Sequence, residues 1–284
     1  MDSLLSLIRQ TLNEDAAGRD ITSRALLPPT LRIRARVIAK QPGVVAGTVA
    51  ARTAFLAHDR RLRCVIQRRD GQPVRAGQAV LSVSGSARSI FAAERTALNL
   101  LGHLCGIATL TSRYARMARP SRVRILDTRK TLPGLRALQK EAVRAGGGMN
   151  HRHDLSDAVL IKTNHLQAMR RAQKGLGDAI EQAVHRARRV AHGKVVEVEV
   201  ADLEQLRAAL EARPDVILLD NFSLRDIRAA VQMVRAGRTH PQLEVSGGVT
   251  LATVRMIART GVERVSIGRL THSAPSLDVS LRVG

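Results

Sequence analysis

The chain has 284 residues, of which 44% are hydrophobic, so it can bury one large core or two modest ones. It carries 46 basic and 24 acidic side chains, a net charge of +22, and only four aromatic residues (three Phe and one Tyr). No apolar run approaches the roughly 18 residues that cross a bilayer, and the first residues do not resemble a secretory signal. The two cysteines, Cys64 and Cys105, form no CxxC pattern, which indicates buried thiols in a reducing cytoplasm.

The positive charge allows two interpretations: a nucleic-acid-binding protein, or an arginine-rich surface together with a site for acidic small molecules. The few aromatic residues offer no visible platform for stacking bases. The arginines are also dispersed. Arg32, Arg34 and Arg36 alternate with apolar residues, which is typical of a strand with one wet face. Both observations favour the second interpretation and leave nucleic-acid binding as the alternative from a different class.

The first 120 residues predict a mixed α/β region. In chain order we expect a helix over 3–12, a loop through "EDAAGRDITS", a strand near 31–40, a helix near 48–57, and strands near 62–68 and 79–84. A long helical region over 86–118 follows. We expect Gly102 and Gly106 to interrupt it and Pro120 to end it.

From about residue 122 the pattern becomes regular. The strand-like runs are "VRILD" (123–127), "AVLIK" (158–162), "VVEVEV" (195–200), "VILLD" (216–220), "LEVSG" (243–247) and "VSIG" (265–268). The helical segments lie near 133–145, 176–191, 202–212, 223–236 and 250–259. Repeated β-then-α units predict a parallel sheet, either a barrel or a doubly wound sheet.

Polar residues or glycines end almost every one of these strands. They are Asp127, Lys162, Glu199, Asp220, Ser246-Gly247-Gly248 and Gly268. Active sites of parallel α/β barrels lie at the carboxyl ends of the strands. A single aspartate there is usually a helix cap, but a whole series on one rim predicts an active site.

The charges on this rim indicate what it binds. Arg129, Lys130, Arg152 and Lys162 form a dense cationic set, and arginine matches carboxylate or phosphate with two parallel hydrogen bonds. Glycine loops such as "SGG" and "IGR" let backbone N–H groups approach a phosphate, especially where a helix begins, as expected at Thr250. The rim therefore predicts sites for carboxylates and for a phosphate, with Glu199 and Asp220 facing a metal or a developing cation.

A zinc site is the alternative for His151, His153 and Asp154. The H-x-H pattern has low specificity, and Arg152 between the histidines would repel a cation. We expect His153 and Asp154 to be an exposed loop pair.

Several longer motifs of the chain resemble those of a known family. "DTRKTLPGLRALQKEAVRAGGGMNHR", "LSDAVLIKTNH", "VEVEV", "LLDNF", "EVSGGVT" and "GVERVSIGRLTHSAPSLDVSL" resemble the quinolinate phosphoribosyltransferase family. The resemblance runs nearly end to end, since "EDAAGRDITS" and "ERTALNLLGHLCGIATLT" belong to it as well.

The resemblance implies an open (incomplete) α/β barrel with an N-terminal α/β-sandwich domain. The sandwich would cover 1–118 together with 274–284, and the barrel would cover 119–273. It implies transfer of phosphoribosyl from phosphoribosyl pyrophosphate to quinolinate with decarboxylation, giving nicotinate mononucleotide, pyrophosphate and CO2 in NAD biosynthesis. It also implies Mg²⁺ as cofactor, a cytoplasmic location and a homodimer.

The resemblance further implies roles for individual residues. Quinolinate would be bound by Thr128, Arg129, His151, Arg152 and Lys162, and by Arg95 donated from the neighbouring subunit. Phosphoribosyl pyrophosphate would be bound by Lys130, Glu199, Asp220, Ser246, Gly247, Gly248, Gly268 and Arg269. The catalytic set would be Lys130, Lys162, Glu199 and Asp220. Glu199 and Asp220 would hold the magnesium, directly or through water.

Two positions depart from the family pattern. Arg269 stands where a small residue is familiar, and Thr163 stands where an acidic residue is common. Two related enzymes are the alternatives: a molybdenum-associated relative, which differs at the "NHR" and "IKxNH" motifs that are intact here, and a nicotinate-using phosphoribosyltransferase, which would need fewer cations.

Overall fold

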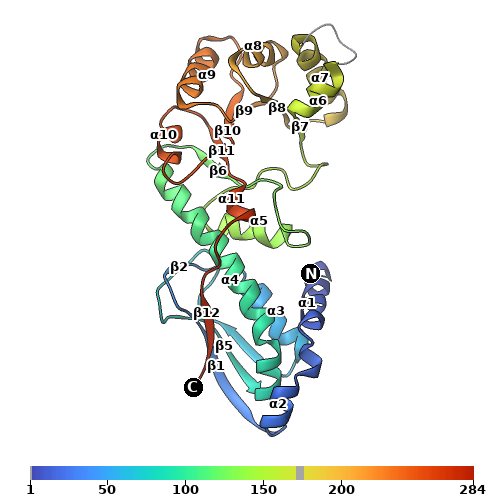
Figure 1. Cartoon of the computed structure of the whole chain (residues 1–284), viewed down its shortest axis with the longest axis vertical. Coiled ribbons are helices and arrows are strands. Elements are labelled where there is room, and N and C mark those ends of the chain that lie inside the picture. The colour runs from blue at the N-terminus through green and yellow to red at the C-terminus, as the bar shows by residue number, and fades with distance from the viewer. Residues whose placement is uncertain (1, 171–175) are drawn as a thin grey trace. The chain divides into compact units, whose positions relative to one another are not determined.

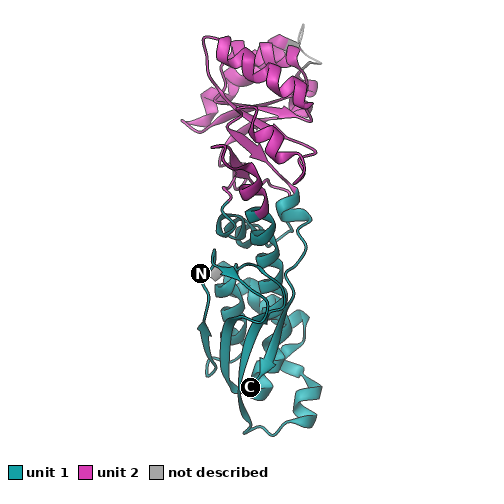
Figure 2. Cartoon of the chain, turned by 90° about the vertical axis from the view of Figure 1, so that its left-hand side faces the viewer, with its two compact units in different colours: residues 1–112, 131–147, 269–284 teal, residues 113–130, 148–268 magenta. Residues whose placement is uncertain are grey.

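The computed structural model of the chain describes residues 2–170 and 176–284. They form two compact units, coloured separately in Figure 2. The first comprises 1–112, 131–147 and 269–284, and the second comprises 113–130 and 148–268. The segment 131–147 therefore packs with the first unit, whereas the resemblance assigned it to the barrel.

The first unit is built on an antiparallel sheet in the order β12-β1-β5-β3. Its strands are β1 (Arg32–Ala39), β3 (Arg63–Ile66), β5 (Ala79–Ser86) and β12 (Val279–Val283), and a separate pair joins β2 (Gly43–Val44) to β4 (Pro73–Val74). Figure 1 shows β12, the red C-terminal strand, beside the blue β1. The prediction of a strand with one wet face is confirmed, because Ala35 and Val37 are buried while Arg34 and Arg36 are exposed.

Three helices pack on the apolar face of this sheet: α1 (Asp2–Glu14), α3 (Thr48–His58) and the first part of α4 (Ala87–Ala118). The unit also contains a 3₁₀ turn at Ala17–Arg19, α2 (Ile21–Leu26), and α5 (Arg136–Ala145) and α11 (Arg269–His272), which contact each other. Ile8 of α1, Phe55 of α3 and Leu101 of α4 belong to one buried cluster with Val37 and Leu81 of the sheet.

Two expectations for this unit were wrong. The segment expected to be a loop contains α2, whose N-terminus is capped by Asp20, which accepts a hydrogen bond from Ser23 N at 3.0 Å. The long helix α4 is continuous through both glycines. Gly106 serves close packing instead, because a Cβ there would lie 2.1 Å from the carbonyl oxygen of Pro275.

The second unit is built on a parallel sheet in the order β6-β11-β10-β9-β8-β7. Its strands are β6 (Arg124–Leu126), β7 (Val159–Ile161), β8 (Val196–Val200), β9 (Val216–Asp220), β10 (Gln242–Ser246) and β11 (Arg264–Ser266). All six were predicted to within a few residues. The order leaves β6 and β7 as edge strands that do not pair with each other among the described residues, so the predicted open barrel is confirmed.

The second unit's helices are α6 (Thr163–Arg170), α7 (Leu176–Ala191), α8 (Leu203–Ala212), α9 (Leu224–Ala236) and α10 (Val254–Ala258). Helix α10 starts four residues later than expected, after a turn in which Thr250 and Thr253 hydrogen-bond to each other. No helix in the described ranges is both long and apolar enough to pass through a bilayer.

Alternation along the parallel strands divides the sheet into two chemically different faces. One face is apolar and buried, with Val196, Val198 and Val200 of β8 alongside helices α7 and α8. The other face carries charge, with Glu197 and Glu244 inside β8 and β10 and Arg264 at the start of β11. Each of these three lies two residues before a residue at the carboxyl end of its strand, so the polar face continues from the interior to the rim.

Candidate active site

The carboxyl ends of the parallel strands bring the predicted rim residues of the second unit together. Lys162 follows β7, Glu199 is the penultimate residue of β8, and Asp220 ends β9. Ser246 ends β10 and pairs in register with Asp220. Lys130 follows β6, and its backbone N–H donates to Thr128 Oγ1 at 3.0 Å. These positions come from five strands that are far apart in sequence.

Two carboxylates and two lysines of this rim interact electrostatically. Partial burial raises the pKa of Asp220, and the neighbouring charge of Glu199 raises it further, while Lys130 and Lys162 act in the opposite direction. Thr163 fixes Glu199, since its backbone N–H and its hydroxyl both donate to Glu199 Oε1, at 3.1 and 2.9 Å. The residue that departs from the family pattern thus orients a predicted catalytic carboxylate.

The guanidinium groups of Arg129 and Arg152 interact electrostatically. Burial lowers the pKa of Arg152, and the nearby positive charge of Arg129 lowers it further. The Arg152 side chain is held by its Nη1, which donates to the carbonyl of Ala158 at 3.0 Å. Bringing two like charges together in a buried setting is unfavourable, and a bound dianion would offset this repulsion.

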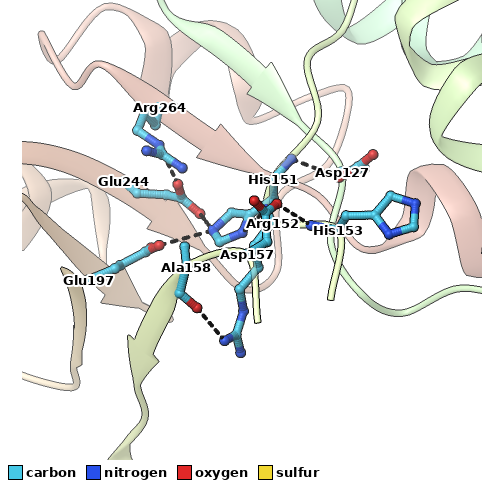
Figure 3. A network of polar contacts seen from close by, with 9 residues as sticks. All are labelled: Asp127, His151, Arg152, His153, Asp157, Ala158, Glu197, Glu244 and Arg264. Atoms are coloured by element: carbon cyan, nitrogen blue, oxygen red, sulfur yellow. Dashed lines mark hydrogen bonds and ion pairs between the residues drawn. The ribbon is translucent and has the colours of Figure 1, made fainter. Parts of the chain in front are cut away.

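His151 occupies a different position from the one expected of a substrate ligand. Its Nε2 lies 3.1 Å from Glu197 Oε2 and 3.3 Å from Glu244 Oε1, and both glutamates are buried (Figure 3). Its Nδ1 accepts the backbone N–H of Arg152 at 2.8 Å. Both ring nitrogens are therefore engaged by the protein itself.

The charges of this buried network offset one another. Glu244 Oε2 forms an ion pair with Arg264 Nε at 2.6 Å. Burial raises the pKa of Glu197, whereas His151 and Arg264 outweigh burial at Glu244 and lower its pKa. Burial lowers the pKa of His151, but the two glutamates outweigh it and raise the pKa to about 9. The Arg152 N–H contact disfavours the doubly protonated ring and so opposes that rise.

Asp127 anchors the loop that carries His151 and Arg152. This carboxylate is fully buried and accepts hydrogen bonds from His151 N at 2.9 Å and from Asn150 Nδ2 at 2.6 Å. Figure 3 shows Asp127 beside the start of this loop. His153 and Asp154, further along, form the predicted exposed pair, 3.8 Å apart and each about half exposed (55% and 52%).

The predicted phosphate loop follows β10. Gly247 has φ +87°, and a Cβ there would lie 2.1 Å from Asn221 Oδ1, so the turn after β10 packs directly on the turn after β9. The backbone N–H of Asn221 donates to Ser246 O at 2.9 Å. Gly247 and Gly248 line a hollow of about 240 Å³ together with Phe222. Gly268 directly precedes α11, whose first residue, Arg269, is exposed.

Arg95 belongs to the first unit, on α4. It is exposed and lines a hollow of about 300 Å³ with Glu14, Asp15 and His103.

Among the residues that the structure describes, two groups could hold a cation. His151, Glu197 and Glu244 offer three ligand atoms within 4.8 Å of one another, but the ring-to-carboxylate distances are those of hydrogen bonds and Arg264 already balances Glu244. Glu199 and Asp220 fit a hard divalent cation better, since they offer carboxylate oxygens at the rim and their like charges raise the pKa of Asp220.

Fold and rim define an enzyme class: an open α/β barrel whose mouth combines cations for an acidic substrate with a glycine loop for a phosphate. Comparison with known proteins narrows this class. Residues 20–105 match the model of the quinolinate phosphoribosyl transferase N-terminal domain, and residues 107–282 match that of the C-terminal domain.

Individual relatives are similar to this chain over nearly their full lengths. A nicotinate-nucleotide pyrophosphorylase [carboxylating] of Mycobacterium leprae is 41% identical over 99% of this chain and 97% of its own. A probable enzyme of that name from Bacillus subtilis is 37% identical over 99% of this chain and 93% of its own. The solved nicotinate-nucleotide pyrophosphorylase of Francisella tularensis has a TM-score of 0.90 and 37% identity, covering 100% of this chain and 96% of that one.

The chain therefore belongs to the quinolinate phosphoribosyltransferase family, as its motifs predicted, and it is a phosphoribosyltransferase. Sequence reasoning missed Asp127 as an anchor and missed the network of Glu197, Glu244 and Arg264. The available signal was charge in the middle of strands that otherwise read as buried.

Proposed function

We propose that the mouth of the open barrel transfers phosphoribosyl from phosphoribosyl pyrophosphate to quinolinate and releases CO2, giving nicotinate mononucleotide and pyrophosphate. The observation that carries the proposal is the convergence of Lys130 and Lys162 with Glu199 and Asp220 at the carboxyl ends of one parallel sheet. Cations suit a dicarboxylate and a pyrophosphate, and carboxylates suit a developing positive charge.

Quinolinate binds through its two adjacent carboxylates. Arg129 and Arg152 form paired hydrogen bonds to them, and Lys162 and Thr128 complete the site. His151 supports this arrangement from beneath, because its ring accepts the N–H of Arg152. The role of His151 then lies in holding Arg152 in place.

The reaction uses the substrate's own nucleophile. The ring nitrogen of quinolinate attacks the anomeric carbon, and the bond from that carbon to the pyrophosphate oxygen breaks. The ribosyl group passes through a state with oxocarbenium character, which Glu199 and Asp220 stabilise electrostatically. Holding nitrogen and carbon in line removes a large part of the entropic barrier. The carboxylate next to the cationic nitrogen then leaves as CO2, its electron pair passing to the ring, with Lys130 or Lys162 as proton source.

Magnesium is part of this proposal. Glu199 and Asp220 would hold it, directly or through water. When bound, Mg²⁺ neutralises charge on the departing pyrophosphate. Ser246, Gly247, Gly248, Gly268 and Arg269 would hold the 5′-phosphate.

We propose a homodimer in which Arg95 of one subunit reaches the quinolinate bound by the other. The supporting observation is that Arg95 is exposed on α4 in a different compact unit from the rim. Mixing Arg95→Ala with Lys130→Ala subunits restores activity if each hybrid dimer contains one intact site. Absence of recovery despite confirmed subunit exchange would show that Arg95 acts within its own chain.

The decisive assay combines the protein with quinolinate, phosphoribosyl pyrophosphate and magnesium, and measures nicotinate mononucleotide. Nicotinate in place of quinolinate is the matched control, because it lacks one carboxylate. Product from nicotinate but not from quinolinate, with a folded protein, would contradict the proposal. A chelator arm tests magnesium separately.

A further inference from the structure

The outer face of the antiparallel sheet in the first unit is lined by arginine. Alternation and register place Arg32, Arg34 and Arg36 of β1, Arg63 of β3 and Arg282 of β12 on the side opposite the buried core, and all five are exposed. We call this surface the arginine face. The arginine face contains none of the residues to which we assign a role in the transferase reaction.

The arginine face is chemically one-sided. None of the four strands contains an Asp or Glu. The outward positions between the arginines on β5 are hydroxyl residues: Ser82, Ser84 and Ser86 pair with Arg36, Arg34 and Arg32 respectively. Within the described residues, none of the five arginine side chains has a hydrogen bond or an ion pair.

Two of these arginines face each other directly. Arg36 of β1 pairs with Arg282 of β12 across the strands. Like charges in directly opposite positions destabilise a sheet. The arrangement therefore costs the isolated protein stability, and a ligand carrying negative charge would relieve that repulsion.

The spacing fits an extended polyanion better than a small anion. Alternate residues on a strand are roughly 6.7 Å apart and neighbouring strands about 4.8 Å apart, so the face measures about 13 Å by 14 Å. Over about 13 Å of axis, duplex nucleic acid presents about eight phosphate charges. One small anion would use two guanidinium groups and leave the others without a partner.

We propose that the arginine face binds the phosphate backbone of double-stranded nucleic acid without reading its sequence. Planar guanidinium groups match phosphate with paired hydrogen bonds. The four strands contain no aromatic residue on which the bases of a single strand could stack. A second copy of the same face would meet its own positive charge. The net charge of +22 strengthens attraction to a polyanion at long range.

The experiment uses the full chain and a labelled 20-base-pair duplex of arbitrary sequence, followed by fluorescence anisotropy from 50 to 300 mM NaCl. If all five arginines contact phosphate, they contribute about −4.5 to the slope of log K against log [salt]. The triple variant Arg34→Ser/Arg36→Ser/Arg282→Ser should reduce that slope by about 2.7 in magnitude and weaken binding roughly 10²- to 10³-fold at 0.1 M salt.

A matched control removes the same charge elsewhere. Arg189, Arg207 and Arg228 are exposed on α7, α8 and α9 of the second unit, and their triple Ser variant should leave the slope nearly unchanged. Equal losses in both triple variants would show that binding is spread over the whole basic surface and would overturn the proposal.

Three further measurements distinguish duplex binding at the arginine face from other sites and other ligands. Saturating pyrophosphate and quinolinate should not displace the duplex, since displacement would place it at the barrel mouth. Tighter binding of poly-glutamate or of phosphatidylserine vesicles than of the duplex, or no duplex binding at 50 mM salt, would refute the assignment. Because the arginine-face variant lacks the opposed charges of Arg36 and Arg282, its Tm should equal or exceed that of the native protein. Such a Tm together with unchanged transferase activity would confirm that its loss of binding is local.

Discussion

Replacing Arg264 by Met tests how the buried charges beneath the barrel mouth are balanced. Arg264 Nε lies 2.6 Å from Glu244 Oε2, and the side chains are 14% and 0% exposed. Methionine keeps most of the arginine stem but removes the charge, which leaves Glu244 with His151 as its remaining cationic neighbour and with the hydroxyl of Ser266. Breaking a buried pair from one side costs about 3–5 kcal/mol, because an uncompensated charge remains. We therefore expect Tm to fall by roughly 10 °C.

The pH dependence follows from the direction of the Glu244 pKa. In the native protein this pKa is lowered, so its stabilisation is present above the unfolded pKa and lost as pH falls through the folded pKa. Without Arg264 that contribution shrinks. The difference in the free energy of unfolding between the native protein and the Arg264→Met variant should therefore be largest near neutral pH and smaller near pH 4. Urea unfolding at several pH values measures this.

Two controls make the test specific. The double variant Arg264→Met/Glu244→Gln removes both charges and should recover most of the loss, to within about 1 kcal/mol of the native protein. Arg188→Met breaks the pair with Asp215, which has a similar distance of 2.8 Å but is 44% and 41% exposed, so it should cost less than about 1 kcal/mol. Equal losses in Arg264→Met and Arg188→Met would refute the reasoning.

Three other predictions concern the loops and charges of the site. The two glutamates raise the folded pKa of His151 to about 9, above its unfolded value of 6.5, so the stabilisation is present below pH 6.5 and lost as pH rises through the folded pKa. It should stay below about 3 kcal/mol, because the Arg152 N–H bond to Nδ1 opposes double protonation. The stability difference from His151→Gln should shrink over that range, and parallel curves would contradict this. Gly247→Ala should raise KM for phosphoribosyl pyrophosphate and lower Tm, because the new Cβ meets Asn221, whereas Gly248→Ala, with φ +59° and open space, should do less. Asp220→Asn should lower kcat at least tenfold with little change in quinolinate affinity measured by calorimetry, and an unchanged kcat would remove Asp220 from catalysis.

The regular part of the fold was predictable because its signal is local. Six β-branched runs alternate with amphipathic segments, and each run became a strand of the parallel sheet. Errors arose where a distant contact decides the local structure. Gly102 and Gly106 look like breaks in a helix, yet α4 continues because the segment near Pro275 packs against it and leaves no room for a side chain. The strand β12 likewise exists because β1 offers it an edge.

The composition of the rim could be predicted from sequence, whereas that of the barrel interior could not. Residues at strand ends gather whatever the register, so Glu199 and Asp220 could be placed together from sequence. Glu197 looks identical to Glu199 in "VEVEV", and only the position along the strand sets one in the buried network and the other at the mouth. Parallel strands covered on both faces are ordinarily apolar. Charge in their middle must therefore be balanced inside the barrel, and Glu197, Glu244, Arg264 and His151 balance one another there. A charged residue two positions before a strand-end residue is thus a sequence signal for a polar barrel interior. In this protein that interior holds the loop of His151 and Arg152 in place.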